Sequence, residues 1–424
     1  MILCIWRYGP KQYNTGAYAL RSVFLLKRST HRLLLLITSI TVISFFYVTY
    51  LTISGYFDVK PADYPLKTPN GGRKLILGWT TWFSMSTTRL FGKNLSNCPA
   101  PLIGACDITD DHKYLLSADA VLFHWWMEDM DFKHMPANRS QSQRFVFWLL
   151  EPPYKTWFKS QLRGQYNAYF NWTMTYRLDS DTASYKNIRL SPLAGLDGVV
   201  TNTSYDQLLD LVATRSRPIA WFVSSCQYFR DTASRRMNYV LAFQRYIQVD
   251  VYGKCGTLTC TDCDDVLAKN YYFYLSFENS VCRDYVTEKF KRALKARVIP
   301  IVFHGEVCRR AGVPEGSYIA ADSFASPRHL ANYLKYLISN RTAYLQYFQW
   351  YKSYQPATNV HLVDNYSNSL QACILCTMLH DNTLPVKHYP AIYDWWITDA
   401  ACEPMYGETL LHDQRYDLVP LTIH

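Results

Sequence analysis

Residues 271–289 read YYFYLSFENSVCRDYVTEK, and this stretch decides how the middle of the chain folds. The aromatic run 271–277 has no helical spacing, so it predicts a buried strand. Residues 278–280 then lie at the carboxyl end of that strand. Asp284 is a suitable N-cap for a following helix, because Val286, Phe290 and other apolar residues recur at helical spacing after it.

The predicted junction between this strand and helix suits a phosphorylated ligand. A helix N-terminus has free backbone N–H groups and a partial positive charge, to which Lys289 adds a full charge. The carboxyl ends of parallel strands are also where open α/β sheets bind ligands. The alternative interpretation is that Glu288 and Lys289 form an ordinary solvated helix face.

The stretch resembles the α-1,3-fucosyltransferases, which form glycosyltransferase family ten. Further segments match that family in the same order: FNWTMTYR with DSD in 170–181, WFVSSC in 221–226, VDVYGKCG in 249–256, DSFASP in 322–327 and YFQW in 347–350. The resemblance covers roughly residues 75–405. It implies the GT-B architecture, in which two Rossmann-like domains face a cleft.

The alternation of predicted strands and helices supports an α/β fold independently of the resemblance. Strands are expected at 75–78, 120–124, 145–150, 219–224, 248–252 and 298–303, with helices at about 232–246 and 327–339. We predict a cytosolic tail (1–32), a transmembrane anchor (33–53), a stem (54–72), an acceptor-side α/β domain (73–216), a GDP-fucose-binding domain (217–355) and a C-terminal segment returning to the first domain (356–424).

The N-terminal part indicates a membrane anchor. Residues 33–53 carry no charged side chain, and 21 residues at helical rise are about 30 Å, the thickness of a bilayer core. Lys and Arg flank the segment only on its N-terminal side, which leaves the later residues lumenal. Alternatives are a cleaved signal peptide and a buried core helix. With the family resemblance, we expect a single-pass type II protein of the Golgi membrane.

The net charge of +10 does not indicate nucleic-acid binding. Six basic residues precede Asp58, the first acidic residue, so the remainder of the chain is only mildly basic. There is also no Gly-x-Gly-x-x-Gly and no Walker loop, which leaves a dinucleotide oxidoreductase or a kinase without support.

Sequons and cysteines fit a lumenal position of the chain after the apolar segment. Six sequons follow that segment, at Asn94, Asn138, Asn171, Asn202, Asn340 and Asn365, although Asn171 lies where tight packing is expected. Eleven of the twelve cysteines also follow it, as an oxidising compartment permits.

Two Cys-x-x-Cys pairs, 260–263 and 373–376, allow a zinc interpretation, since paired thiolates suit tetrahedral coordination. In a secretory lumen we expect disulfides instead. The family resemblance implies that an early pair, Cys98 and Cys106, bridges to Cys373 and Cys376. Spacing alone does not give this connectivity.

The resemblance implies transfer of L-fucose from GDP-fucose to a GlcNAc hydroxyl with inversion at the anomeric carbon. Such a reaction needs a base for the acceptor hydroxyl and cations for the diphosphate. For the base we choose Glu151, which follows the apolar strand 145–150, precedes Pro152 and Pro153, and matches the family's proposed base. Alternatives are a solvated strand-end Glu151 and the carboxylates Glu128, Asp129 and Asp131.

Lys289 and Arg236 are the predicted diphosphate ligands, because a guanidinium grips two phosphate oxygens at once. Arg235 is the competing assignment for Arg236. The resemblance places Asn279, Tyr285 and Glu288 against the ribose and fucose of the donor, with Glu278 as a further member. His124 is an acceptor-site candidate, or else a packed strand-end histidine.

Asp179-Ser180-Asp181 has the form of a motif that holds a divalent ion in single-sheet glycosyltransferases. Because it falls inside the family's own first-half block, we expect a structural or substrate-loop role and no metal ligand. No cofactor is then required besides the donor substrate, with Mn²⁺ at most a stimulant.

The chain departs from the family pattern near the expected cleft: Tyr272 replaces a frequent Lys, Ser225 a frequent Asn, and Phe303-His304-Gly305 a Gly-Gly or Gly-Pro pair. For the acceptor, residues 255–256, 378–381 and 395–396 look more like the branch that fucosylates the core GlcNAc of N-glycans. The alternatives are a Lewis-type antennal enzyme and an inactive glycan-binding homologue.

Overall fold

The computed structural model describes residues 61–62, 72–96, 98, 104–126, 135–156, 159–182, 190–192, 202–226, 233–352, 354–356, 367–382 and 384–413. The chain divides into two compact units, Met1–Asp58 and Val59–His424, and all described residues lie in the second. Among them, we find no helix with the length and apolar character needed to cross a bilayer. The predicted anchor, 33–53, lies outside the described residues.

The first of two larger sheets has five parallel strands in the order β3-β2-β4-β6-β7. They are β2 (Lys74–Gly78), β3 (Cys106–Thr109), β4 (Ala120–His124), β6 (Arg144–Leu149) and β7 (Trp172–Thr175). One face packs on α2 (Thr87–Phe91) and α11 (Ser367–His380). The other face packs on an aromatic layer that includes Tyr166, Phe170 and Trp396, so both faces are buried.

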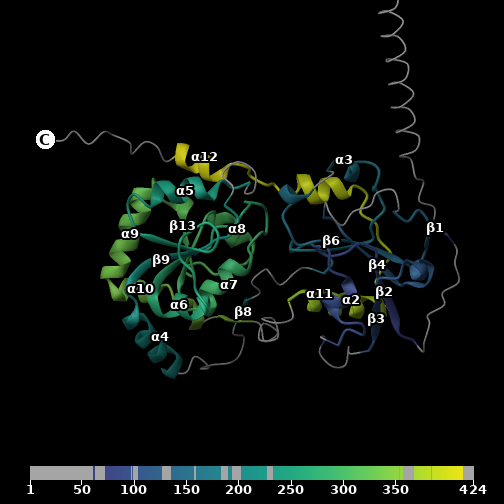
Figure 1. Cartoon of the computed structure of the whole chain (residues 1–424), viewed down its shortest axis with the longest axis horizontal. Helices are drawn as coiled ribbons and strands as arrows, with labels where there is room; N and C mark the ends of the chain where they lie inside the picture. The colour runs from purple at the N-terminus through teal and green to yellow at the C-terminus, as the bar shows by residue number, and fades with distance from the viewer. Residues whose placement is uncertain are drawn as a thin grey trace, which may run out of the picture. The chain divides into compact units, whose positions relative to one another are not determined.

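The second sheet is also parallel, in the order β10-β9-β11-β12-β13. Figure 1 labels its strands β9 and β13. Its strands are β9 (Arg217–Phe222), β10 (Val249–Tyr252), β11 (Tyr271–Leu275), β12 (Ile299–Val302) and β13 (Ile319–Ala320). One face packs on α5 (Arg236–Phe243), α9 (Pro327–Ser339) and α10 (Arg341–Gln346). The opposite face packs on α6 (Cys263–Asn270), α7 (Glu288–Lys295) and α8 (Gly305–Arg310). Burial on both faces explains the near-continuous apolar runs in these strands.

The remaining elements are short pairs, helices and turns. Strand β1 (Pro61–Ala62) pairs with β5 (Arg139–Ser140), and β8 (Leu190–Pro192) pairs with β14 (Tyr354–Pro356). The others are α3 (Lys159–Leu162), α4 (Asn202–Thr214), α12 (Tyr406–Asp413), the 3-10 turns η1 (His112–Ser117), η3 (Pro153–Lys155), η4 (Ala321–Ser323) and η5 (Gln349–Lys352), and the π-turn η7 (Asp394–Thr398).

The end of the chain contributes to both sheets. Helix α11 returns to the first sheet, where it packs against β2 and α2. Helix α12 instead packs on α5 beside the second sheet, with Tyr406 and Leu410 in the core there. The predicted α/β fold with two parallel sheets is therefore confirmed, and the C-terminal segment reaches the second sheet as well as the first.

The predicted helix start at Asp284 is wrong. Helix α7 begins at Glu288 with Thr287 as its N-cap, and Asp284 lies four residues earlier in a left-handed conformation with φ of 63°. Its carboxylate accepts a hydrogen bond from the backbone N–H of Leu178 at 3.2 Å. A disulfide between Cys282 and Cys402 and the burial of Tyr285 hold this loop against the core.

Candidate functional site

The carboxyl end of β11 positions Glu278 at the N-terminus of α7. Its carboxylate is buried and accepts hydrogen bonds from the backbone N–H of Thr287 at 2.8 Å and from the Thr287 hydroxyl at 2.7 Å. A carboxylate is favourable there because free N–H groups and the helix dipole converge on it. Glu278 therefore fixes the junction between the strand and the helix.

Lys289 completes a buried ion cluster at this junction. Its Nζ lies 2.9 Å from Glu278, 3.0 Å from Glu288 and 2.9 Å from the Thr287 hydroxyl. Burial alone lowers the pKa of Lys289, but the two carboxylates outweigh it and raise the pKa above its ordinary value. The ammonium is thus held charged. Sequence reasoning missed Thr287, although a threonine directly before a charged helix start is a recognisable N-cap signal.

Arg236, the first residue of α5, approaches the same strand end from the other side. The residue is 4% exposed, and its Nη1 donates a hydrogen bond to the backbone carbonyl of Phe277. Its guanidinium lies 5.7 Å over the ring of Trp221. Burial lowers the pKa of Arg236, and the charge of Glu278 opposes that shift. Within the described part of the chain, its Nε has no hydrogen-bond partner.

The neighbouring Arg235 is oriented differently. Its Nε lies 4.0 Å from the carboxylate of Glu408 in α12. The backbone around it is held by α12 as well, since the N–H of Gly407 donates to the Ser234 carbonyl at 2.7 Å. Of the two arginines, Arg236 is therefore the one buried beside Glu278 and Lys289.

Two further polar atoms at this strand end lack a hydrogen-bond partner among the described residues, Asn279 Oδ1 and Ser280 Oγ. Both are buried atoms, and buried polar groups in proteins are nearly always paired. A cavity of about 20 Å³ lies beside Ser280 and is also lined by Glu278 and Tyr285. Unpaired buried donors and acceptors next to free space are what a preformed polar ligand site presents.

Tyr285 lies between this cluster and the first sheet. Its ring is buried and meets Tyr176 edge-on with the centroids 4.8 Å apart. Burial raises the pKa of Tyr285 well above its ordinary value, and the negative charges of Glu151 and Glu278 raise it further. Glu288, by contrast, has a side chain that is 58% exposed.

Glu151 follows β6 in the first sheet. Leu150 and Pro152 on either side of it are buried, while Glu151 itself is half-buried. Within the described residues, its carboxylate makes no hydrogen bond or ion pair. The alternative carboxylates Glu128, Asp129 and Asp131 lie outside the described residues.

His124 is packed into the core. The residue is 1% exposed and lies among aromatic rings, with the Trp148 ring centroid 4.9 Å away. Its backbone N–H donates to the hydroxyl of Thr80 at 2.6 Å, and its Nδ1 lies 3.2 Å from the carbonyl of Thr81. This environment agrees with the packed alternative, and the acceptor role of His124 stays a prediction.

The carboxylates of Asp179-Ser180-Asp181 are engaged by side chains of the protein. Asp179 pairs with Arg177 at 2.6 Å, and although burial acts to raise the pKa of Asp179, this pair lowers it. Asp181 accepts hydrogen bonds from the Thr173 N–H at 2.9 Å and the Tyr389 hydroxyl at 2.8 Å, and pairs with Lys387 at 2.5 Å. These contacts support a structural role for the motif.

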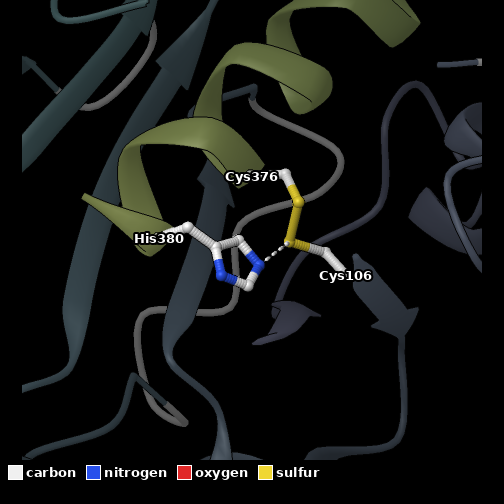
Figure 2. A group of neighbouring side chains, drawn as sticks. All are labelled: Cys106, Cys376 and His380. Carbon is white, nitrogen blue, oxygen red and sulfur yellow. Dashed lines mark hydrogen bonds between the residues drawn. A yellow bond between two sulfur atoms is a disulfide. The ribbon is translucent and has the colours of Figure 1, made fainter. Parts of the chain in front are cut away.

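Ten of the described cysteines form disulfides, Cys308 is a free buried thiol, and four of the bonded cysteines pair as the family resemblance implies. Cys98 joins Cys373, and Cys106 joins Cys376, which fastens α11 to the first sheet. Figure 2 shows His380 beside the second bond, with Nε2 3.9 Å from the Cys106 sulfur. Although these three residues have the composition of a metal site, the bonded sulfurs are not thiolates and do not suit one.

Further pairs join Cys226 to Cys255, Cys260 to Cys263 and Cys282 to Cys402. The disulfide within 260–263 disfavours the zinc interpretation of that Cys-x-x-Cys pair.

The structure contradicts Asn171 as a glycosylation site. The residue is 1% exposed; its Oδ1 accepts the Phe145 N–H at 2.9 Å, and its Nδ2 donates to the Lys387 carbonyl at 2.9 Å. Both polar atoms of the Asn171 amide are hydrogen-bonded inside the fold, so a glycan cannot be accommodated there. Asn94 and Asn138 are exposed, and Asn340 caps α10. The side chain of Asn202 and all of Asn365 lie outside the described residues.

Comparisons with known proteins match both halves of the chain. The family model "Fucosyltransferase, N-terminal" covers residues 71–186, and "Glycosyltransferase family 10 (fucosyltransferase) C-term" covers residues 212–395. The chain is 34% identical over 358 residues to alpha-(1,3)-fucosyltransferase C of Drosophila melanogaster, which spans 76% of this chain and 77% of that protein.

Other relatives carry names that differ in the acceptor. Glycoprotein 3-alpha-L-fucosyltransferase A of Drosophila melanogaster is 30% identical over 81% of this chain and 64% of that protein. 3-galactosyl-N-acetylglucosaminide 4-alpha-L-fucosyltransferase FUT3 of Pongo pygmaeus is 32% identical over 74% and 78%. A crystal structure of an alpha1,3-fucosyltransferase with GDP-fucose aligns at 17% identity over 78% of this chain and 97% of that chain, with a TM-score of 0.44.

Proposed function

The chain belongs to glycosyltransferase family 10 and is an α-1,3-fucosyltransferase, and we propose that it transfers L-fucose from GDP-β-L-fucose to GlcNAc of glycoprotein glycans with inversion. The observation that carries this proposal is the convergence of Arg236, Lys289 and unpaired buried polar atoms on the carboxyl end of β11. We further propose that the two sheets belong to the two domains of a GT-B enzyme.

The charges around β11 are balanced until an anion binds. Arg236 and Lys289 are two cations, and Glu278 and Glu288 are two carboxylates, so their formal charges cancel. A diphosphate can compete for Lys289 by displacing the exposed Glu288 carboxylate, and the unpaired Arg236 Nε can donate to it directly. As the bond to fucose breaks, negative charge grows on GDP, and preorganised cations stabilise that charge.

Glu151 supplies the base in this proposal. Removing the proton of the acceptor hydroxyl requires a carboxylate that is not already committed, and Glu151 meets that requirement within the described residues. Besides burial, the charge of Glu151 helps to raise the pKa of Tyr285, which supports a position near the donor cluster formed by Arg236, Glu278, Glu288 and Lys289. An inverting transfer needs no covalent nucleophile, and side chains together with the α7 N-terminus take the place of a metal at the diphosphate.

The acceptor we propose is the core GlcNAc of N-glycans. The matches in residues 255–256, 378–381 and 395–396 favour it, as does the similarity to a relative named for glycoprotein 3-fucosylation. The alternative is a Lewis-type antennal acceptor, favoured by the similarity to a 3-galactosyl-N-acetylglucosaminide fucosyltransferase at close to the same identity. An inactive glycan-binding homologue is disfavoured, because a pure binder needs neither a base nor a diphosphate site.

Incubation of the purified protein with GDP-fucose and a panel of glycan acceptors tests the activity and the acceptor together. Product linkage analysis should show fucose at O3 of the core GlcNAc. Transfer only to the antennal GlcNAc would favour the Lewis-type alternative, and GDP-fucose binding without transfer to any acceptor would favour the inactive homologue.

We also propose that residues 33–53 anchor the protein in the Golgi membrane with the catalytic part in the lumen. The length of the segment and the basic residues on one side of it support this topology. N-terminal sequencing of the membrane-derived protein should find the chain intact before Leu33. A single form beginning at or after Ser54 would indicate a signal peptide or cleavage in the stem.

A further inference from the structure

A second pocket lies at the outer edge of the second sheet, apart from the donor cluster. Strand β13 is the edge strand there, and the pocket beside it has a volume of about 310 Å³. Four aromatic rings line it, those of Tyr318, Phe324, Tyr333 and Tyr347. The volume is within the range of small-molecule sites, which are typically lined by aromatic side chains with a few polar groups.

The three tyrosine hydroxyls of the pocket are engaged by other groups of the protein. The hydroxyls of Tyr333 and Tyr347 bond to each other at 2.8 Å, and the Tyr318 hydroxyl donates to the Gly305 carbonyl at 3.3 Å. Phe324 packs on Tyr333 with the centroids 5.4 Å apart. The walls of the pocket are therefore fixed aromatic surfaces.

The polar groups of the pocket are free to bind a ligand. Glu315 and Ser323 line it, and neither side chain makes a hydrogen bond or ion pair with any described residue. The lining contains the carboxylate of Glu315 and no cation, although Arg309 lies close enough to interact with that charge, so nucleotides and acidic sugars find no cationic partner among the described lining residues. A neutral ligand with apolar C–H faces and several hydroxyls satisfies both the rings and the two polar side chains.

We propose that this pocket binds one neutral pyranose residue of the acceptor's glycan chain. The choice of a glycan rests on the proposed function, while the preference for a neutral, polyhydroxylated ring rests on the pocket itself. The pocket is linked to the donor side of the sheet through Asp322 of η4. Asp322 accepts hydrogen bonds from the Gly305 N–H at 3.1 Å and lies 2.8 Å from His304, which lines the cavity beside Glu278.

Replacement of Ser323 by Trp tests the proposal, because it fills the pocket from an exposed position without removing a packed ring. The matched control is Asn332→Trp, on the exposed face of α9 and outside the pocket. Saturation-transfer NMR on the full chain in detergent, with the trimannosyl-chitobiose N-glycan core pentasaccharide as probe, should show transfer for the parent and Asn332→Trp. Because the catalytic site also binds this pentasaccharide in the proposed function, transfer should be reduced but not abolished for Ser323→Trp, with GDP present in all samples.

Kinetics separates this proposal from the proposed function. Ser323→Trp should raise KM for a glycoprotein acceptor by about tenfold or more. Its kcat and its affinity for GDP-fucose should be unchanged. If fucose is transferred but all three proteins show equal saturation transfer and equal KM, the pocket is not a sugar site and the proposed function stands. If the pentasaccharide binds in a Ser323-dependent way but no acceptor is fucosylated, the pocket proposal stands and the proposed function does not.

Discussion

Replacement of Arg236 by Gln should weaken GDP-fucose binding strongly, whereas the same change at the neighbouring Arg235 should not. The two residues are adjacent in sequence and identical in chemistry, so the pair forms a matched test of the geometry. Arg236 is buried beside Glu278 and Lys289, and Arg235 reaches toward Glu408. Gln keeps much of the length of Arg and some hydrogen bonding, but removes the charge.

The magnitude follows from the charge balance at the end of β11. Without Arg236, the carboxylates of Glu278 and Glu288 face the diphosphate with only Lys289 to offset them. A hydrogen bond to a charged group contributes about 1.5 to 3 kcal/mol, which is about ten- to more than a hundredfold in Kd. For Arg235 the lost contacts include a long, partly exposed ion pair with Glu408, so we expect less than about a threefold change.

Isothermal titration with GDP and GDP-fucose measures the two effects, and thermal unfolding of each variant establishes that it is folded. Gln at position 236 can still donate a hydrogen bond to the Phe277 carbonyl, which limits the loss of stability. If both variants bind GDP as the parent does, the cluster at β11 is not the diphosphate site. If the Arg235 variant is the weaker binder, the assignment of the two arginines is reversed.

Three further predictions concern the base, the acidic motif and a titrating histidine. Glu151→Gln should reduce kcat by about 10² to 10⁴, the usual contribution of a general base, with GDP-fucose affinity retained; a folded variant transferring fucose at the parent rate would exclude Glu151. Asp181→Asn should lower the unfolding temperature because it weakens contacts to Thr173, Tyr389 and Lys387. EDTA should reduce turnover only modestly. Loss of all turnover in EDTA, with recovery on addition of Mn²⁺, would contradict the structural interpretation of the acidic motif. The hydrogen bond to Asp322 raises the pKa of His304. The stability that His304 contributes is therefore complete below the unfolded-state pKa of about 6.5 and is lost as pH rises through the folded-state pKa. His304→Gln should lower the unfolding temperature more at pH 6 than at pH 9, and an equal loss at both pH values would refute this.

The local sequence pattern was sufficient to predict a strand where that strand is buried on both faces of its sheet. The runs at 120–124 and 271–277 contain the strands β4 and β11 within two residues, because a parallel sheet covered by helices requires continuous apolar sequence. The position of Lys289 and Glu288 at the start of a helix was likewise predictable, although the helix begins later than Asp284 suggested. The loop between the strand and the helix is set by a disulfide to Cys402, 120 residues away, which no local signal contains.

Side-chain partners distant in sequence were not predictable from pattern. Asn171 satisfies the sequon rule, but in the fold its amide bridges the Phe145 backbone and the Lys387 carbonyl. Asp181 resembles a metal ligand in sequence, but its partners Tyr389 and Lys387 come from a segment about 200 residues later. In both cases the C-terminal part of the chain supplies the partner, so the role of the residue depends on tertiary structure.

The same dependence on tertiary structure explains how Arg236 and Lys289 stay buried and charged at the carboxyl end of β11. Burial disfavours the charged forms of Arg236 and Lys289, and Glu278 offsets that cost for both of them. Glu278 in turn is held by Thr287 at the N-terminus of α7, where a carboxylate is stabilised. In the proposed donor site, Glu278 therefore lowers the net attraction for a diphosphate, but it supports the charged state of both cations. Loss of Glu278 should for this reason reduce catalysis through the positions of Lys289 and Arg236, even though it removes a negative charge from an anion-binding site.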